Sequence, residues 1–276
     1  GLSGIIHIYI KRGHKGHCNE IKVVDAAEGM DYLSLKKAIE FSGDTSGFKE
    51  GRTVRGFFGR GLKESIIALG KGTILTLKDG VISVAEISYN EEEKDAKYDL
   101  SVPTKGLTDQ ELSNLGFIDK SGTIIKIEIT NNDKNYIPRR RFLEETICNN
   151  YSLRDIHSSD KRKITLFYSE NDSDDSFELN TPIKYSFPTG ILRYDKDVEI
   201  ENYQCHFRIF ESPELLESVK CGLLIKTEGA ILDNQLFGYE TDPIAPYFFG
   251  TITCPAIAEI IRKGDESIID LSRGGL

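Results

Sequence analysis

Short stretches in which apolar and polar residues alternate recur along the chain, and they predict β-strands with one buried face. The first two are Ile5 to Ile10 and Glu20 to Val24, and their closeness in sequence predicts a hairpin. Thr73 to Leu77 and Val81 to Ile87 predict a second hairpin, because Lys78-Asp79-Gly80 between them is a strong tight-turn sequence. The N-terminal part of the chain is therefore expected to be rich in antiparallel sheet.

Later stretches continue this pattern and mix it with helices. Ile125, Ile127 and Ile129 face one way in the next predicted strand. Further strands are predicted over 163–168, 177–180, 183–186, 203–210, 222–227 and 250–253, and helices, from the spacing of apolar residues, over 32–41, 62–69, 139–149, 213–219 and 256–263. The stretch Asn90 to Asp99 is read as an acidic excursion, and Asn171 to Ser176 is the best linker candidate.

The length of 276 residues fits one large or two ordinary domains, and we expect two, residues 1–170 and 171–276. No apolar run approaches the length of a membrane span and no signal-peptide pattern is present, so we expect an intracellular globular protein, cytoplasmic or, in a eukaryote, nuclear. The net charge of −9 argues against a wide basic surface for nucleic acid. Arg139 to Arg141 is the densest basic run, and it is read as a solvated helix start in preference to a nucleic-acid site.

The five cysteines show no Cys-x-x-Cys spacing, which favours reduced thiols over a disulfide framework or a zinc ribbon. His14, His17 and Cys18 come nearest to a metal-ligand cluster, but no second cluster with suitable spacing accompanies them. We therefore predict no metal site there.

Three glycines, Gly56, Gly59 and Gly61, lead directly into the helical pattern of 62–69. Glycine lets backbone N–H groups approach phosphate oxygens, and a helix N-terminus adds partial positive charge, so this stretch is a candidate phosphate cradle that Lys63 could strengthen. It is not a Walker loop, because Leu62 precedes the lysine, and no strand leads in as a Rossmann fingerprint requires. Close packing of the helix for purely structural reasons is the alternative.

Asp25 ends a predicted strand and is followed by small residues, so its carboxylate could meet a ligand that lies against the backbone. An ordinary turn acid is the alternative. Beyond it, Ser42 to Gly51 is too polar and too rich in glycine to pack against a core. That segment is expected to be mobile, either as a ligand lid or as an inert surface loop.

Three elements in fixed order, Asp25-x-x-x-Gly29-Met30, Gly56-x-x-Gly59-x-Gly61 and Gly122-Thr123, resemble the GHKL superfamily. This superfamily includes DNA gyrase, heat-shock chaperones of the ninety-kilodalton class, histidine kinases, MutL and the Microrchidia ATPases. The resemblance covers roughly residues 5–170 and is nearest the chaperone and Microrchidia branches; the second unit looks like a smaller α/β transducer or middle domain. It implies an α/β (α+β) sandwich of the Bergerat type, with a mostly antiparallel sheet and helices on one face.

The resemblance also implies roles for individual residues. Asp25 would accept a hydrogen bond from the adenine amino group, Thr123 would support the adenine side, and Asp31 to Arg55 would form the lid. Ala27 departs from the family's motif, which has a glycine there. The implied ATP-binding residues are Asp25, Gly29, Met30, Gly56, Gly59, Gly61, Leu62, Lys63 and Thr123, with the glycines of the second motif and Lys63 at the phosphates.

One departure concerns catalysis. Members of the family carry an earlier helix with a Glu that activates water and an Asn that holds Mg²⁺, whereas the residues before Asp25 read here as strands. The catalytic residue is therefore unknown, and no metal ligand is assigned. Both ends of the chain look cut, which suggests a fragment of a longer ATPase.

The resemblance implies a GHKL-type ATPase that binds ATP with Mg²⁺, orders its lid, and draws two domains or two protomers of a homodimer together until hydrolysis releases them. Two alternatives stay open: an interaction module that senses adenine nucleotide without hydrolysing it, and a scaffold with a degenerate fold. The client, protein or DNA, is not indicated, and no membrane partner is expected.

Overall fold

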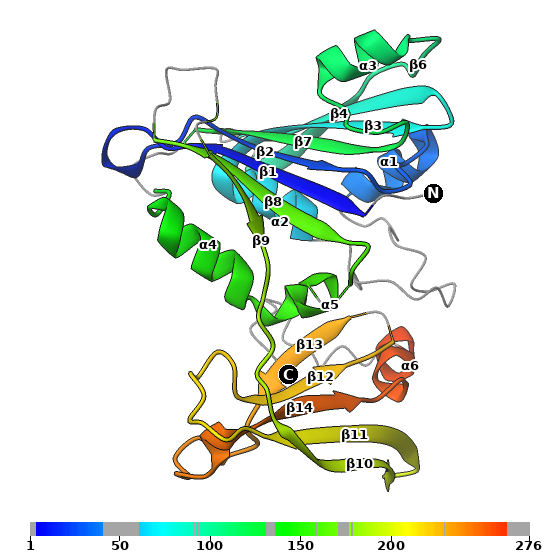
Figure 1. The fold of residues 1–276 in the computed structure, drawn as a ribbon. Coiled ribbons are helices and arrows are strands. Elements are labelled where there is room, and N and C mark those ends of the chain that lie inside the picture. The colour runs from blue at the N-terminus through cyan, green and yellow to red at the C-terminus, as the bar shows by residue number, and fades with distance from the viewer. Residues whose placement is uncertain are drawn as a thin grey trace. The chain divides into compact units, whose positions relative to one another are not determined.

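The computed structural model describes residues 4–40, 61–90, 92, 94–130, 136–157, 159–170, 177, 179–228 and 230–263 (Figure 1). The described residues within 4–40, 61–145 and 159–184 form one compact unit. Those within 146–157 and 185–263 form a second. Compactness does not show which stretches fold on their own, so the division at residue 170 stays a prediction.

The first unit is built on a large, mostly antiparallel sheet. Its strands are β1 (Ile5–Lys11), β2 (Glu20–Asp25), β3 (Gly70–Lys78), β4 (Val81–Asn90), β5 (Asp95–Leu100), β6 (Thr104–Lys105), β7 (Gly122–Ile129), β8 (Lys163–Ser169) and β9 (Leu179–Ile183). They lie in the order β5-β4-β3-β7-β2-β1-β8-β9, and β6 pairs with β4. β1 and β8 run parallel, and the other described pairs of this sheet are antiparallel.

Two helices, α1 (Tyr32–Ile39) and α2 (Gly61–Leu69), cover one face of this sheet. α1 begins after Asp31, whose carboxylate accepts a hydrogen bond from the backbone N–H of Ser34 and so caps the helix. Leu35, Ile39 and Ile66 are fully buried in a cluster with apolar residues of β3, β4 and β7. The apolar residues whose spacing predicted these two helices therefore form the face of each helix that packs on the sheet, as expected.

A third helix, α3 (Asp109–Leu115), packs on the opposite face, and the sequence analysis did not predict it. Thr108 and Glu111 form a capping box at its start. Leu112 and Phe117 pack with apolar residues of β2, β3, β4 and β7. The expectation of helices on one face thus holds for α1 and α2 only.

The chain leaves the first unit through α4 (Arg140–Asn149), which is followed by η2 (Tyr151–Leu153) and α5 (Arg154–His157). Arg140 pairs with Glu144 and Arg141 with Glu145, one helical turn on. Pairs of this spacing on a helix surface stabilise it by roughly 0.3–0.5 kcal/mol each. The predicted helix at 139–149 is confirmed.

The second unit has its own sheet and a helix. Its elements are β10 (Ile191–Ile200), β11 (Tyr203–Glu211), β12 (Gly222–Lys226), β13 (Ile231–Gln235), η3 (Ala245–Tyr247), β14 (Phe248–Thr253) and α6 (Ala256–Arg262). The strand order is β10-β11-β14-β12-β13, with β12 and β14 parallel. A small core of Cys205, Ile252 and Cys254 lies between the sheet and α6.

Both predicted hairpins are confirmed, and Asp79 and Gly80 take the positive φ angles that the tight turn of the second one requires. Other expectations are wrong. Residues 213–219 form no helix, the strand expected at 183–186 ends at Ile183, and the acidic excursion contains β5. In the first of these stretches the backbone N–H of Leu216 donates to the Pro246 carbonyl at 3.1 Å, a partner outside the stretch, instead of to a carbonyl of its own turn.

Candidate functional site

A row of polar residues crosses the first sheet beneath α1 and α2. Asp25 on β2 lies opposite Thr123 on β7, Thr123 lies opposite Thr76 on β3, and Thr76 lies opposite Ser83 on β4. Residues directly opposite one another in a sheet share a face. A continuous polar line therefore runs through a face that is otherwise apolar, and it ends at Asp25.

Asp25 is held by backbone groups on both sides. Its Oδ1 atom accepts hydrogen bonds from the backbone N–H of Ala27, at 2.9 Å, and of Thr123, at 3.2 Å. Burial raises the pKa of this carboxyl, while the two backbone hydrogen bonds act in the opposite direction. A fixed, partly desolvated carboxylate accepts hydrogen bonds and cannot donate them, so it can select a ligand that presents an N–H₂ group.

Thr76 joins this row to the turn that follows β2. Its fully buried hydroxyl accepts a hydrogen bond from the backbone N–H of Met30 at 2.6 Å, and it lies 3.4 Å from both the Gly122 carbonyl and the Thr123 hydroxyl. Ser121 fixes the same turn with another hydrogen bond, because its hydroxyl donates to the Ala27 carbonyl at 2.7 Å. The backbone around Asp25 is thus fixed by side chains of β3 and of the residue before β7.

Two glycines allow the turn to approach these strands closely. Gly29 has a φ of +67°, and a Cβ atom there would lie 2.1 Å from the Leu77 carbonyl oxygen. Gly122 has a φ of +142°, and a Cβ atom there would lie 2.1 Å from the Asp25 carbonyl oxygen. Any larger residue at either position would displace the turn from the strands.

Ala27 occupies the position at which the family's motif has a glycine. Its φ is not positive, and the residue is exposed, so its methyl group is tolerated. Met30, half-buried, packs against the cluster under α1 and α2. The first motif is therefore assembled around Asp25 despite the substitution.

The second motif is described only in part. Gly61 is the first residue of α2, Leu62 packs into the cluster beneath it, and Gly56 and Gly59 lie outside the described residues. The Lys63 side chain is fully buried, and its ammonium group donates a hydrogen bond to the backbone carbonyl of Glu40, the capping residue that follows α1. The end of a helix carries unsatisfied carbonyls and partial negative charge, which suits an ammonium group. A contact of Lys63 with phosphate stays a prediction.

The first ten residues of the expected lid, 31–40, are α1 with its cap and are anchored to the sheet by Leu35 and Ile39. Residues 41–55, the rest of the expected lid, lie outside the described residues. The described residues before Asp25 form β1, η1 (His14–Gly16) and β2. Within the described part of the chain, no three His, Cys, Asp or Glu side chains lie close enough together to hold a metal ion.

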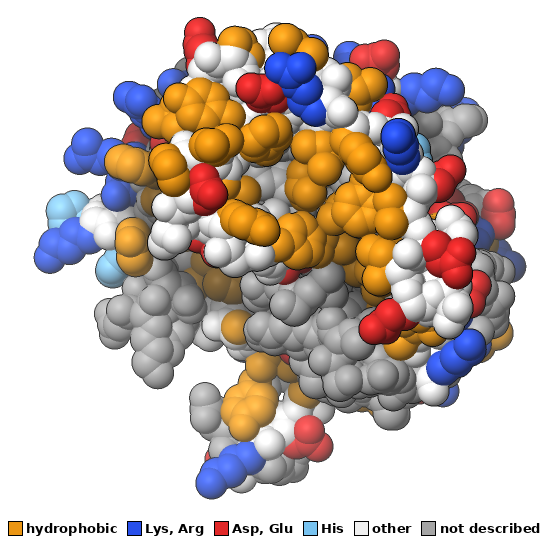
Figure 2. All heavy atoms as spheres, turned by 90° about the horizontal axis from the view of Figure 1, so that it is seen from below, with side chains coloured by type: hydrophobic (Ala, Val, Ile, Leu, Met, Phe, Trp, Pro, Cys, Tyr) orange, Lys and Arg blue, Asp and Glu red, His pale blue; other side chains and the backbone are white. Residues whose placement is uncertain are grey.

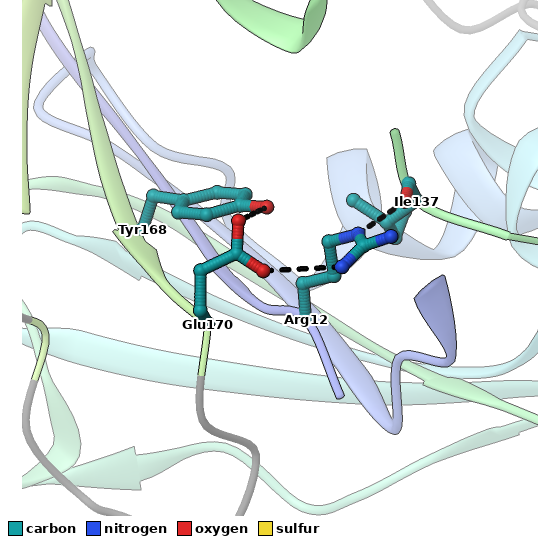
Figure 3. A network of polar contacts seen from close by, with 4 residues as sticks. All are labelled: Arg12, Ile137, Tyr168 and Glu170. Carbon is teal, nitrogen blue, oxygen red and sulfur yellow. Dashed lines mark hydrogen bonds and ion pairs between the residues drawn. The ribbon is translucent and has the colours of Figure 1, made fainter. Parts of the chain in front are cut away.

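A second polar network lies at the other end of β1 (Figure 3). Arg12 donates through Nε to the Ile137 carbonyl at 2.9 Å and pairs through Nη1 with Glu170 at 3.1 Å, and the Tyr168 hydroxyl donates to Glu170 at 3.1 Å. Burial, followed by the hydrogen bond to Glu170, raises the pKa of Tyr168 to about 12. These contacts fix the stretch before α4 to the ends of β1 and β8, so we interpret this network as structural.

Sequence reasoning missed Thr76, Ser121 and Ser83. Their positions beside Asp25 follow from strand order and register, which the sequence does not state. One signal was present: Thr76 is a polar residue at a position that the alternation of its strand assigns to the buried face, together with Ile74. A buried hydroxyl needs a hydrogen-bond partner, so such a position indicates a nearby polar site.

Comparison with protein families agrees with this geometry. Residues 3–123 match the family model described as "Histidine kinase-, DNA gyrase B-, and HSP90-like ATPase". The matched stretch contains Asp25, Gly29 and Lys63 and ends at Thr123, so it includes the whole turn and supports a GHKL-type ATPase domain in the first unit. A comparison with curated proteins finds none that matches the chain. No described helix is both long and apolar enough to cross a membrane.

Proposed function

We propose that the first unit binds ATP, with the Asp25 carboxylate accepting a hydrogen bond from the adenine amino group. The observation that carries the proposal is the fixed carboxylate at the end of β2, held by two backbone N–H groups. The family match over the same stretch supports it. Thr123, with its hydroxyl 3.4 Å from that of Thr76, lines the adenine side.

The phosphates are assigned to Gly56, Gly59, Gly61 and Lys63. Gly61 opens α2, and the N-terminus of a helix that follows a glycine-rich segment attracts anions. The proposal assigns no residue to Mg²⁺, because the described residues supply no cluster of ligands for it. When bound, Mg²⁺ would offset the negative charge of the phosphates.

In the proposed cycle, ATP orders the lid over residues 41–55, closure brings the two units or two protomers together, and loss of nucleotide reverses the change. The residues Gly61 to Lys63 support a place near the Microrchidia branch, and Gly122-Thr123 with the strand that follows supports a place near the chaperone branch. The alternative is a module that senses adenine nucleotide without turnover. It is consistent with the described residues before Asp25, which form β1, η1 and β2 and provide no general base that we can identify.

Thermal shift with ATP, ADP and GTP tests the binding. We expect the two adenine nucleotides to raise the melting temperature and GTP to have little effect. Replacing Asp25 with Asn exchanges a charged acceptor for a neutral amide and should cost about 1.5–3 kcal/mol, roughly 10- to 150-fold in affinity. Asp99→Asn, an exposed change on β5, is the matched control. Unchanged affinity in folded Asp25→Asn protein would refute the assignment.

Phosphate release measured on the same samples separates the two functions. A general base supplies about 10²- to 10⁴-fold in rate, and none is identified among the described residues around Asp25. We therefore expect the 276-residue chain to bind ATP and to hydrolyse it barely above background. Steady hydrolysis that Asp25→Asn abolishes would contradict this, and Glu28 would then be the first base to test.

A further inference from the structure

An apolar groove of about 800 Å³ crosses one face of the second unit's sheet. Phe207 and Ile209 of β11 and Leu223 of β12 come from the inner strands of the sheet. Tyr194 and Val198 of the edge strand β10 line one side, and the segment that follows β13 at the other edge lines the opposite side through residues 236–245. The groove therefore runs over the sheet between its two edges.

The wall that follows β13 exposes large apolar side chains. Phe237 is 52% exposed, Tyr239 63% and Ile244 62%. Figure 2 shows hydrophobic side chains gathered broadly on the face seen from below, with charged side chains around them. Folded proteins in water seldom expose a contiguous apolar area of this kind unless it binds a partner.

The groove continues a helix–sheet interface that is already present. Ala256 and Ile257 of α6 pack on the core around Cys205, and Phe207 and Leu223 belong both to that packing and to the groove. α6 thus covers one part of the face, and the groove is the adjoining part. A sheet buries its apolar face by adding a layer, and a helix is the element that already forms this layer here.

The two margins of the groove carry opposite charge. On the β10 side, Arg193 lines the groove and is paired with Glu211, whereas Lys196 lies opposite Phe207 in the register, hence on the same face, and supplies positive charge. On the other side, Asp242 lines the groove, and Glu240 precedes it by two residues. A partner with acidic residues along one flank and basic residues along the other would be complementary.

We propose that this groove binds an amphipathic α-helix of a partner protein beside α6. Apolar residues of the helix at positions i, i+3 or i+4, and i+7 enter the groove, its acidic flank faces Lys196, and its basic flank faces Glu240 and Asp242. This inference does not depend on nucleotide binding, because every residue it uses belongs to the second unit.

Fluorescence anisotropy with a labelled synthetic helix tests the proposal. The probe has roughly 18 residues, about five turns, with leucines at the stated spacing, glutamates on one flank and lysines on the other. We expect it to bind, and a peptide of the same composition in scrambled order not to bind. A peptide with the two charged flanks exchanged should bind several-fold more weakly.

Variants of the exposed wall identify the site without disturbing the core. Phe237→Ser and Ile244→Ser should each weaken binding about tenfold, which corresponds to about 1.4 kcal/mol. Leu215→Ser, at a residue of the same unit that is 65% exposed and outside the groove lining, should leave binding unchanged. Asp25→Asn should leave it unchanged as well.

Three results would overturn the proposal. The first is absence of binding by the patterned peptide, and the second is equal binding of the scrambled one. The third is a dimer in sedimentation that becomes a monomer in Phe237→Ser, because a second copy of the chain would then be the occupant of the groove.

Discussion

Asp25 occupies a position where folding alone would favour a neutral side chain. Burial raises its pKa, and the same Oδ1 atom that accepts the two backbone hydrogen bonds would be available in asparagine. The two hydrogen bonds favour the charged form, but the cost of burying the charge is larger, so the charge destabilises the folded state on balance. A carboxylate kept at a cost in stability is typical of a functional site.

Replacing Asp25 with Asn should therefore raise the melting temperature at pH 7 even though it removes nucleotide affinity. Because the pKa of Asp25 is raised in the folded chain, the wild type gains stability as the pH falls through that pKa, and the advantage of Asn should shrink there. Asp31→Asn is the control of opposite sign. Hydrogen bonds from Ser34 lower the pKa of Asp31, so that variant should lose stability at pH 7. Differential scanning calorimetry between pH 4 and pH 8 checks both, and a destabilised Asp25→Asn protein would contradict the argument.

Gly29 is required for two reasons, its positive φ and its closeness to the Leu77 carbonyl, and a control variant separates their costs. Gly29→Ala should cost about 3 kcal/mol or more in the free energy of unfolding, because positive φ and a clash with the Leu77 carbonyl add together. Gly80→Ala has a similar φ, +72°, with nothing within 4 Å of the added methyl, so it should cost only about 1 kcal/mol. Urea unfolding measures the difference. Equal losses of unfolding free energy in the two variants would contradict this, because the turn after β2 would then move away from the Leu77 carbonyl at little cost.

The raised pKa of Tyr168 predicts that the folded protein loses stability at high pH. Its raised pKa, about 12, means that the unfolded chain ionises first. The neutral Tyr168 hydroxyl therefore contributes its full stabilisation below about pH 10, the usual pKa of tyrosine. This contribution is lost as the pH rises through about 12. Tyr168→Phe should unfold with a smaller dependence on pH over this window than the wild type, whereas the exposed control Tyr98→Phe should behave as the wild type does. Parallel pH profiles for Tyr168→Phe and wild type would contradict this reading of the network.

Among the elements, those with strong local signals were predictable. The hairpin of β3 and β4 follows from alternation on both sides of Asp79-Gly80, and α1 and α2 follow from apolar residues at helical spacing. β10 was missed because nearly all its residues are exposed and its pairing with β11 alone defines it. The same holds for the candidate site. Asp25 and Thr123 could be named from sequence motifs, whereas the place of Thr76 beside them depends on the pairing register of β3 and β7, which the sequence does not reveal.

α3 was missed although its start carried a sequence signal, Thr-x-x-Glu at Thr108 and Glu111. Thr108→Ala should remove the cap and cost about 1 kcal/mol in unfolding free energy. Thr108→Ser retains a hydroxyl at the same position and should restore most of that loss. Equal losses in both variants would show that the cap does not hold the helix against Leu77 and Ile82.

At the scale of the whole molecule, the two units share one chain that passes between them more than once. α4 begins in the first unit and ends in the second, the chain returns near residue 159, and it crosses again after residue 184. A domain joined by a single linker would behave independently. If the first unit binds nucleotide as proposed, these crossings are the covalent connections through which the second unit would respond.

Hydrogen exchange followed by mass spectrometry tests whether the proposed lid responds to nucleotide. The sequence of 42–55 is polar and rich in glycine, so we expect fast amide exchange there without ligand and slower exchange with a non-hydrolysable ATP analogue. Asp25→Asn protein should show fast exchange in both conditions. Equal exchange in wild-type protein with and without the analogue would leave this stretch an ordinary loop.

The parallel pairing of β1 with β8 places a constraint on synthesis. Ile5 lies opposite Lys163, so β1 is synthesised long before its second neighbour, and more than half of the 276 residues separate the two positions. Until then, the outer edge of β1 offers unpaired backbone groups to other chains. A chain that ends at residue 123, where the family match stops, would make that state permanent, since it lacks β8 and keeps only the first two residues of β7. Such a product should accumulate in inclusion bodies.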